Sequence, residues 1–160
     1  MHVKVKPAAR LDGEIQALSS KNYTTRCMLA AALAEGESEL LYPARSDDSD
    51  ALRRCLRALG AELEETEERL VIRGFGARPK AAKELDVGNA GAVLRFLMSV
   101  AALCPGDVSF PNKYPESLGK RPHLDLIHAL EQMNVRVTHR DGRLPITIHG
   151  GAPRGGRIRV

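Results

Sequence analysis

The chain has 160 residues, of which 43% are hydrophobic and 28% are charged, and its formal net charge is +4. This composition is typical of a globular domain with a hydrophobic core, and no run of about 18 apolar residues is present to span a membrane. The small positive charge, without a basic run or interleaved aromatic side chains, argues against a nucleic-acid surface and suits small anionic ligands.

The first part of the chain predicts the elements of one supersecondary unit. Alternation of apolar and polar residues indicates a strand, whereas apolar residues spaced by three or four indicate a helix. The expected elements are a strand over 3–5, a helix over 20–35, a strand over 38–42, a helix over 46–59 and paired strands over 61–64 and 70–73. Gly36 ends the first helix, and Ser46, Asp47 and Asp48 are expected to cap the second.

The second part predicts the same order of elements again. They are a helix over 93–103, a strand over 108–110, a helix that begins with Pro122 and paired strands over 136–138 and 145–149. Landmark residues also recur at an offset of roughly 70 residues, which indicates a duplicated unit. The matched pairs are Arg26 with Arg95, Gly36 with Gly106, and Gly74 with Gly150. Another strand pattern follows over 157–160, so we expect a third unit and a longer parent protein.

Two of the predicted helices carry cationic residues at their N-terminal ends. Lys21 and Arg26 follow a good N-cap, Ser19 or Ser20, and Asn22 and Arg26 share one face of the first helix. Gly91 and Arg95 repeat this spacing in the second unit. Because a helix N-terminus already favours anions, we expect a site for phosphate or carboxylate groups. The alternative to an anion site is that these are ordinary capped core helices whose cationic side chains are solvated.

The cysteines and the N-terminal sequence indicate in which cellular compartment the protein is found. Cys27, Cys55 and Cys104 lie inside apolar helical patterns without a C-x-x-C pair, so we expect buried, reduced thiols. The stretch MHVKVKPAARLDGEI has no apolar core of a signal peptide, and we therefore expect a cytoplasmic protein.

Five segments, in the right order between residues 18 and 156, resemble the EPSP synthase (3-phosphoshikimate 1-carboxyvinyltransferase) family. SSKNYTTRCMLAAALAEG is similar to the family's S-K-S-x-x-x-R opening, and DVGNAGAVLRFLMSVAAL to its D-x-G-N-A-G-T-x-x-R-F-L helix. The other three are SDDSDALRRCLRALGAELEE, LGKRPHLDLIHAL and RLPITIHGG.

The resemblance implies an α/β (α+β) fold of two similar domains, each with three β-α-β-α-β-β units, in an inside-out α/β barrel. This chain would supply part of the N-terminal domain: a strand and lead-in over 1–17, units over 18–76 and 77–151, and the start of a third unit over 152–160. The C-terminal domain would be missing.

The resemblance also implies an activity, the transfer of the enolpyruvyl group of phosphoenolpyruvate to the 5-hydroxyl of shikimate 3-phosphate with release of phosphate. It implies no metal or organic cofactor. Members are usually monomeric, and we expect the isolated chain to be inactive and able to self-associate, because the C-terminal groups are absent.

Site residues follow from the matched motifs. Lys21 would contact phosphoenolpyruvate and lie between the substrates, and Arg26 would hold shikimate 3-phosphate. Gly91 would let backbone approach phosphoenolpyruvate, and Arg121 would clamp its phosphate or carboxylate.

Weaker candidates and departures complete the expected site. Asn89 and Arg95 are substrate-binding candidates, although Arg95 could equally brace its helix. Asn22 replaces a family serine and could keep a substrate hydrogen bond. Ala92 replaces a threonine, and His123 replaces a methionine and is expected at a surface or helix-start position.

The residues leave two alternative functions open. Lys21-Asn22 echoes the K-N of the sister family that transfers enolpyruvyl to UDP-N-acetylglucosamine, although the later segments favour the shikimate enzyme. A non-catalytic module that binds a phosphorylated ligand or mediates assembly is the other.

Overall fold

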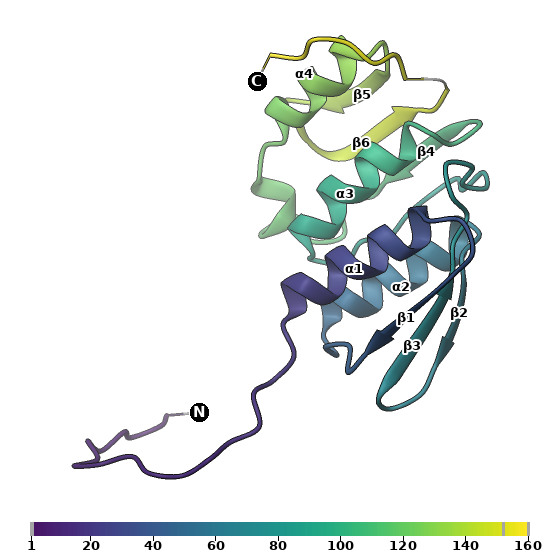
Figure 1. Cartoon of the computed structure of the whole chain (residues 1–160). Coiled ribbons are helices and arrows are strands. Elements are labelled where there is room, and N and C mark those ends of the chain that lie inside the picture. The colour runs from purple at the N-terminus through teal and green to yellow at the C-terminus, as the bar shows by residue number, and fades with distance from the viewer. Residues whose placement is uncertain (1, 152, 160) are drawn as a thin grey trace.

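The computed structural model describes residues 2–151 and 153–159, which form four α-helices and two three-stranded antiparallel sheets (Figure 1). The first half holds α1 (Lys21–Leu33), β1 (Glu37–Leu41), α2 (Asp47–Ala58), β2 (Glu62–Glu65) and β3 (Arg69–Arg73). The second holds α3 (Gly91–Ala101), β4 (Asp107–Phe110), the 3-10 turn η1 (Leu118–Lys120), α4 (Leu124–Gln132), β5 (Arg136–Arg140) and β6 (Arg143–His149). Within these residues no helix has the length and apolar character needed to cross a bilayer.

The two halves repeat one topology. The strand order is β1-β3-β2 in the first sheet and β4-β6-β5 in the second, so the last strand of each half lies in the centre of its sheet. In the first sheet Glu37 pairs with Arg73, and in the second Asp107 pairs with His149. The predicted order of helix, strand, helix, strand, strand is therefore confirmed in both halves.

A glycine at the end of each central strand explains why Gly74 and Gly150 match in the sequence. An added Cβ on Gly74 would collide with the Ala34 and Ala31 carbonyl oxygens, which belong to the end of α1. A Cβ on Gly150 would likewise collide with the carbonyl oxygens of Cys104 and Gly106, which follow α3. In both halves, the chain after the last strand thus packs directly on the chain that ends the first helix.

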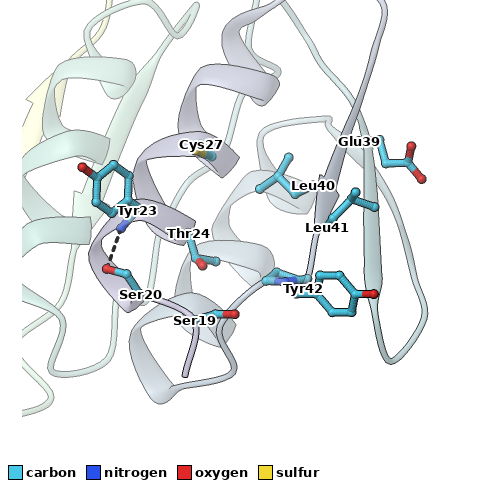
Figure 2. Close-up of a pocket in the computed structure, with 10 residues that line it drawn as sticks. Ser19, Ser20, Tyr23, Thr24, Cys27, Glu39, Leu40, Leu41 and Tyr42 are labelled. Atoms are coloured by element: carbon cyan, nitrogen blue, oxygen red, sulfur yellow. Dashed lines mark hydrogen bonds between the residues drawn. The ribbon is translucent and has the colours of Figure 1, made fainter. Parts of the chain in front are cut away.

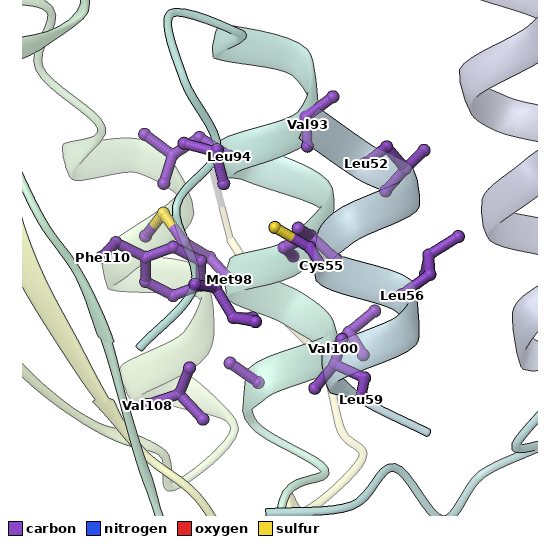
Figure 3. Close-up of a cluster of buried hydrophobic side chains, with 14 of the residues drawn as sticks. Leu52, Cys55, Leu56, Leu59, Val93, Leu94, Met98, Val100, Val108 and Phe110 are labelled. Carbon is purple, nitrogen blue, oxygen red and sulfur yellow. The ribbon is translucent and has the colours of Figure 1, made fainter. Parts of the chain in front are cut away.

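One hydrophobic core joins the halves through α2 and α3 (Figure 3). Side chains of α2 face side chains of α3, and Phe110 of β4 closes the other side. The labelled side chains are Leu52, Cys55, Leu56 and Leu59 on α2, Val93, Leu94, Met98 and Val100 on α3, and Val108 and Phe110 on β4. Each fully buried Leu or Phe contributes about 1.5–3 kcal/mol relative to an exposed one.

The strand expected at the start of each unit is not formed as predicted. Residues 2–20 hold no strand and leave the body as an extended tail (Figure 1), in which Val5 is 85% exposed. A strand needs a partner edge for its backbone groups, and none lies beside this tail in the described part of the chain. In the second half one parallel bridge, Glu84 to Ser109, lies where the β-α-β-α-β-β unit implied by the resemblance would begin with a strand. Residues 157–159 form no strand, and Val160 lies outside the described residues.

The start of α4 is also later than predicted. Pro122 precedes the helix, whose N-cap is His123 and whose first residue is Leu124. The His123 N–H donates to the Gly142 carbonyl at 2.8 Å, which keeps the chain outside the helix at this point. The turn η1, which the sequence patterns did not indicate, lies just before it.

Candidate functional site

The N-terminal end of α1 is built by Ser20, whose hydroxyl accepts a hydrogen bond from the Tyr23 N–H at 3.4 Å (Figure 2). This N-cap satisfies one of the first-turn N–H groups, and the others remain directed out of the helix end. Lys21 and Asn22 are the first two residues of the helix, so their side chains surround this end.

Arg26 and Arg95 make the same contact in the two halves. The Arg26 Nη1 donates to the Asn22 carbonyl oxygen at 3.0 Å, and the Arg95 Nη1 donates to the Gly91 carbonyl oxygen at 3.2 Å. Long side chains on a helix point back toward its N-terminus, so residues four positions into each helix bring a guanidinium group to the first turn. The expected equivalence of Arg26 and Arg95 is thus visible in three dimensions.

Helices α1 and α3 run side by side in the same direction. The Arg26 guanidinium lies over the Phe96 ring, 5.4 Å from its centroid, which is within cation–π range. Further along, Leu33 and Leu103 line one apolar hollow between the two helices. The two N-terminal ends therefore open on the same side of the molecule.

Two arginines face the first turn of α3. A Cβ built on Gly91 would lie 3.2 Å from the Arg121 Nη1 and 3.5 Å from the Arg95 Nη1. Ala90, the N-cap, offers no side-chain acceptor to the first-turn N–H groups. The Asn89 Oδ1 accepts from the Leu118 N–H at 3.2 Å and so fixes η1, the turn that precedes Arg121. We call Asn89, Gly91, Arg95 and Arg121 the α3 cluster.

His123 lies next to the α3 cluster and is buried, with 4% of its surface exposed. Within the part of the chain that the structure describes, neither ring nitrogen has a hydrogen-bond partner. Burial lowers the pKa of His123, and the charges of Arg95 and Arg121 lower it further. The prediction of a helix-start position is confirmed, and the alternative of a surface position is wrong because the ring is enclosed beside the two arginines.

Lys21 pairs with an aspartate of the second helix. Its Nζ lies 3.1 Å from the Asp48 Oδ2, and the two side chains are 49% and 25% exposed. Of the three residues predicted to cap α2, Ser46 is confirmed as the N-cap and forms a capping box with Ser49. The prediction is wrong for Asp47 and Asp48, which are the first two residues of the helix. Asp48 is consequently available to hold the Lys21 ammonium, a pairing that sequence reasoning missed.

A polar hollow of about 530 Å³ lies between the N-terminal end of α2 and the loop before α3. It is lined by Asp47, Asp48, Asp50, Arg54, Gly88, Asn89 and Tyr114. Asp48 contacts Lys21 and Asn89 belongs to the α3 cluster, so this hollow lies between the two groups of predicted residues. Among the described residues, no hydrogen bond or ion pair joins Lys21 directly to Arg121.

A second hollow, of about 470 Å³, lies between α1 and β1 (Figure 2) and contains none of the predicted site residues. Cys27 lines it and is exposed, so the prediction of a buried thiol is wrong there. The buried face of α1 carries Met28, Ala31 and Ala32, which points Cys27 outward. Cys55 and Cys104 are buried as expected, and burial raises the pKa of Cys55 to about 12.

Comparison with known proteins decides the family. The family model for EPSP synthase (3-phosphoshikimate 1-carboxyvinyltransferase) matches residues 5–160. The chain belongs to the EPSP synthase family. The 3-phosphoshikimate 1-carboxyvinyltransferase of Deinococcus radiodurans is 55% identical over 158 residues, which are 99% of this chain and 36% of that protein. The enzyme of the same name from Acetivibrio thermocellus is 33% identical over 163 residues.

A solved EPSP synthase from Acinetobacter baumannii has the same fold in the matched part. It superposes with a TM-score of 0.78 at 26% identity over 87% of this chain and 32% of that structure. This EPSP synthase family chain thus spans about a third of the length of the relatives it matches.

The departures from the EPSP synthase motifs lie at or beside the two helix ends. Asn22 is in the first turn of α1 and Ala92 in the first turn of α3. His123, which replaces the methionine of the family motif, lies beside the α3 cluster.

Proposed function

We propose that the chain provides the anion-binding helix ends of an enolpyruvyl transferase. That enzyme moves the enolpyruvyl group of phosphoenolpyruvate to the 5-hydroxyl of shikimate 3-phosphate and releases phosphate. The observation that supports this most directly is the repeated arrangement at α1 and α3, where an arginine folds back onto the first turn of each helix. Helix N-terminal N–H groups and guanidinium groups are the donors that phosphate and carboxylate prefer.

The two helix ends would divide the substrates between them. The α3 cluster would hold phosphoenolpyruvate, because the Arg121 guanidinium lies against Gly91, where the absence of a Cβ leaves the backbone open. Arg26 and Asn22 on α1 would hold shikimate 3-phosphate. Lys21, fixed at the edge of the polar hollow by Asp48, would contact both substrates and stabilise the charge that develops between them.

The repeat supports a finer description of the fold. We propose that residues 18–76 and 77–151 are two of the three units in the N-terminal domain of the barrel, with 1–17 as lead-in and 152–160 as the start of a third. The identical strand order of the two sheets supports this division.

The isolated chain is expected to bind ligand without turnover. It spans 36% of its Deinococcus radiodurans relative, and addition and elimination need acid and base groups within hydrogen-bond reach of the substrates. A coupled phosphate-release assay on the chain alone should give no signal above background. Substantial turnover would contradict this prediction.

Measuring substrate binding distinguishes part of an enzyme from a module that only mediates assembly. Calorimetric titration with shikimate 3-phosphate and phosphoenolpyruvate should show binding, and Arg121→Gln should weaken that of phosphoenolpyruvate roughly tenfold or more, through loss of a charge-assisted pair. Arg57→Gln, an exposed arginine in the last turn of α2, is the matched control and should have no effect. If neither substrate binds, the module that only mediates assembly is the better description.

A further inference from the structure

The His123 ring is buried beside the α3 cluster. Its nitrogens are enclosed and have no hydrogen-bond partner among residues 2–151 and 153–159, whereas most buried polar side-chain atoms in proteins have one. Its backbone N–H is committed to the Gly142 carbonyl, so the ring is held in place by the main chain. One nitrogen of the neutral ring is therefore free to take up a proton.

The charges around the ring are positive. Arg95 comes from α3 and Arg121 ends η1, and both charges lower the pKa of His123. From the β5–β6 side, His139 is occupied by the Gly142 N–H, which donates to its Nδ1 at 2.9 Å. With the site empty, a proton on His123 would be a third cation in a buried position, so the neutral ring is favoured.

We propose that His123 is a positioning residue for the anion at the α3 cluster: it takes up a proton when a dianion lies between Arg95 and Arg121. The proton comes from solvent and goes to a ring nitrogen, and no other bond changes. A dianion cancels the two guanidinium charges, so the part of the lowered pKa that is due to Arg95 and Arg121 is removed, and the imidazolium that forms adds a further positive charge to the site. This inference rests on the proposed function, because the anion is the one assigned to the α3 cluster.

The consequence is that the affinity for the anion depends on pH, and that this dependence comes from His123 alone. If anion binding raises the pKa of His123, then anion affinity must increase as the pH falls through the pKa of the bound state, and it levels off below the pKa of the empty site. Inorganic sulfate is the suitable probe, because its own charge does not change where histidine titrates. We expect sulfate affinity to rise roughly threefold to tenfold as the pH falls from about 8 to about 5, because the pKa of His123 in the empty site lies below its ordinary value.

Two measurements on the full chain test this. The first follows the imidazole nitrogen signals of His123 by NMR, where sulfate should move its protonation midpoint upward. The second compares the pH dependence of sulfate affinity in the unsubstituted chain, in His123→Met and in His128→Gln, an exposed histidine of α4 that serves as the control. His123→Met should have a flatter pH dependence, and His128→Gln should keep that of the original chain. The NMR measurement needs no variant, so it remains valid if His123→Met fails to fold.

The outcomes separate this inference from the proposed function. Sulfate that shifts the Gly91 amide signal but leaves the His123 ring and the pH dependence unchanged would refute the role of His123 and leave the anion site intact. Sulfate that leaves the Gly91 amide signal unchanged as well would overturn both.

Discussion

Asn89 connects the loop before α3 to η1 through a single side-chain hydrogen bond, from the Leu118 N–H to its Oδ1. Sequence resemblance suggested a substrate contact for Asn89, whereas the structure shows a bond that fixes the turn before Arg121. The position of the Arg121 guanidinium beside Gly91 therefore depends in part on a residue that need not touch the ligand.

Replacing Asn89 by alanine tests this positioning role. We expect Asn89→Ala to lose about 1 kcal/mol of stability, because a partly buried hydrogen bond is removed. The Leu118 amide should then exchange with solvent several-fold faster, and sulfate should bind more weakly at the α3 cluster. Amide exchange and a sulfate titration, both followed by NMR with and without the substitution, check the two effects. Unchanged protection at Leu118 together with weakened sulfate binding would instead indicate a direct ligand contact by Asn89.

At the scale of single elements, the tight contact at Gly74 makes the first half of the chain sensitive to one added methyl group. Gly74→Ala places a Cβ against the carbonyl oxygens that end α1, and backbone cannot move aside as a flexible side chain can. Overpacking of this kind costs typically about 1–3 kcal/mol. We therefore expect Gly74→Ala to lower the free energy of unfolding, measured by urea titration, by about 1–3 kcal/mol or more.

Gly106→Ala is the matched control for this substitution. A Cβ on Gly106 would meet no atom within 4 Å, and it lies just before β4 in a turn. Its stability should change by less than about 0.5 kcal/mol. Equal destabilisation by both substitutions would show that crowding at Gly74 is not the cause of the lost stability.

The helices could be predicted from the sequence because their signals are local. The predicted helix over 20–35 and α1 (Lys21–Leu33) differ by one residue at the start and two at the end, since an apolar period and a serine N-cap lie within the segment itself. Pro122 misled the prediction at α4, because a proline suits the first helical position but the bond from His123 to Gly142 delays the helix.

The strand expected over 3–5 and the pairing of Lys21 with Asp48 depend on distant parts of the chain. A strand forms only where another edge is available, and alternation in the sequence cannot show that the edge is absent. Likewise, Lys21 and Asp48 are on different helices, so no spacing rule could bring them together. The burial of His123 between residues of α3 and η1 was unpredictable for the same reason.

At the scale of the whole molecule, the core between α2 and α3 should make the two halves unfold as one. Each half has its own sheet, but α2 packs its apolar face on α3, and Met98 of α3 is completely buried in the same core, near Phe110 of β4 (Figure 3). Neither half can keep its apolar helix face covered without the other. We therefore expect a single cooperative unfolding transition for the chain, with the same midpoint for both sheets.

Met98→Ala on α3 provides the test of this coupling. The substitution should cost about 2–5 kcal/mol, the usual range for truncating a fully buried methionine. Because the core is shared, slow amide exchange should accelerate equally in β3, which belongs to the other half, and in β6, which belongs to the same half. Ser99→Ala, an exposed neighbour on the same helix, is the control and should leave both sheets unchanged. Faster exchange in β6 alone would mean that the two repeats are independent folding units, and the shared core would then add contact area without cooperativity.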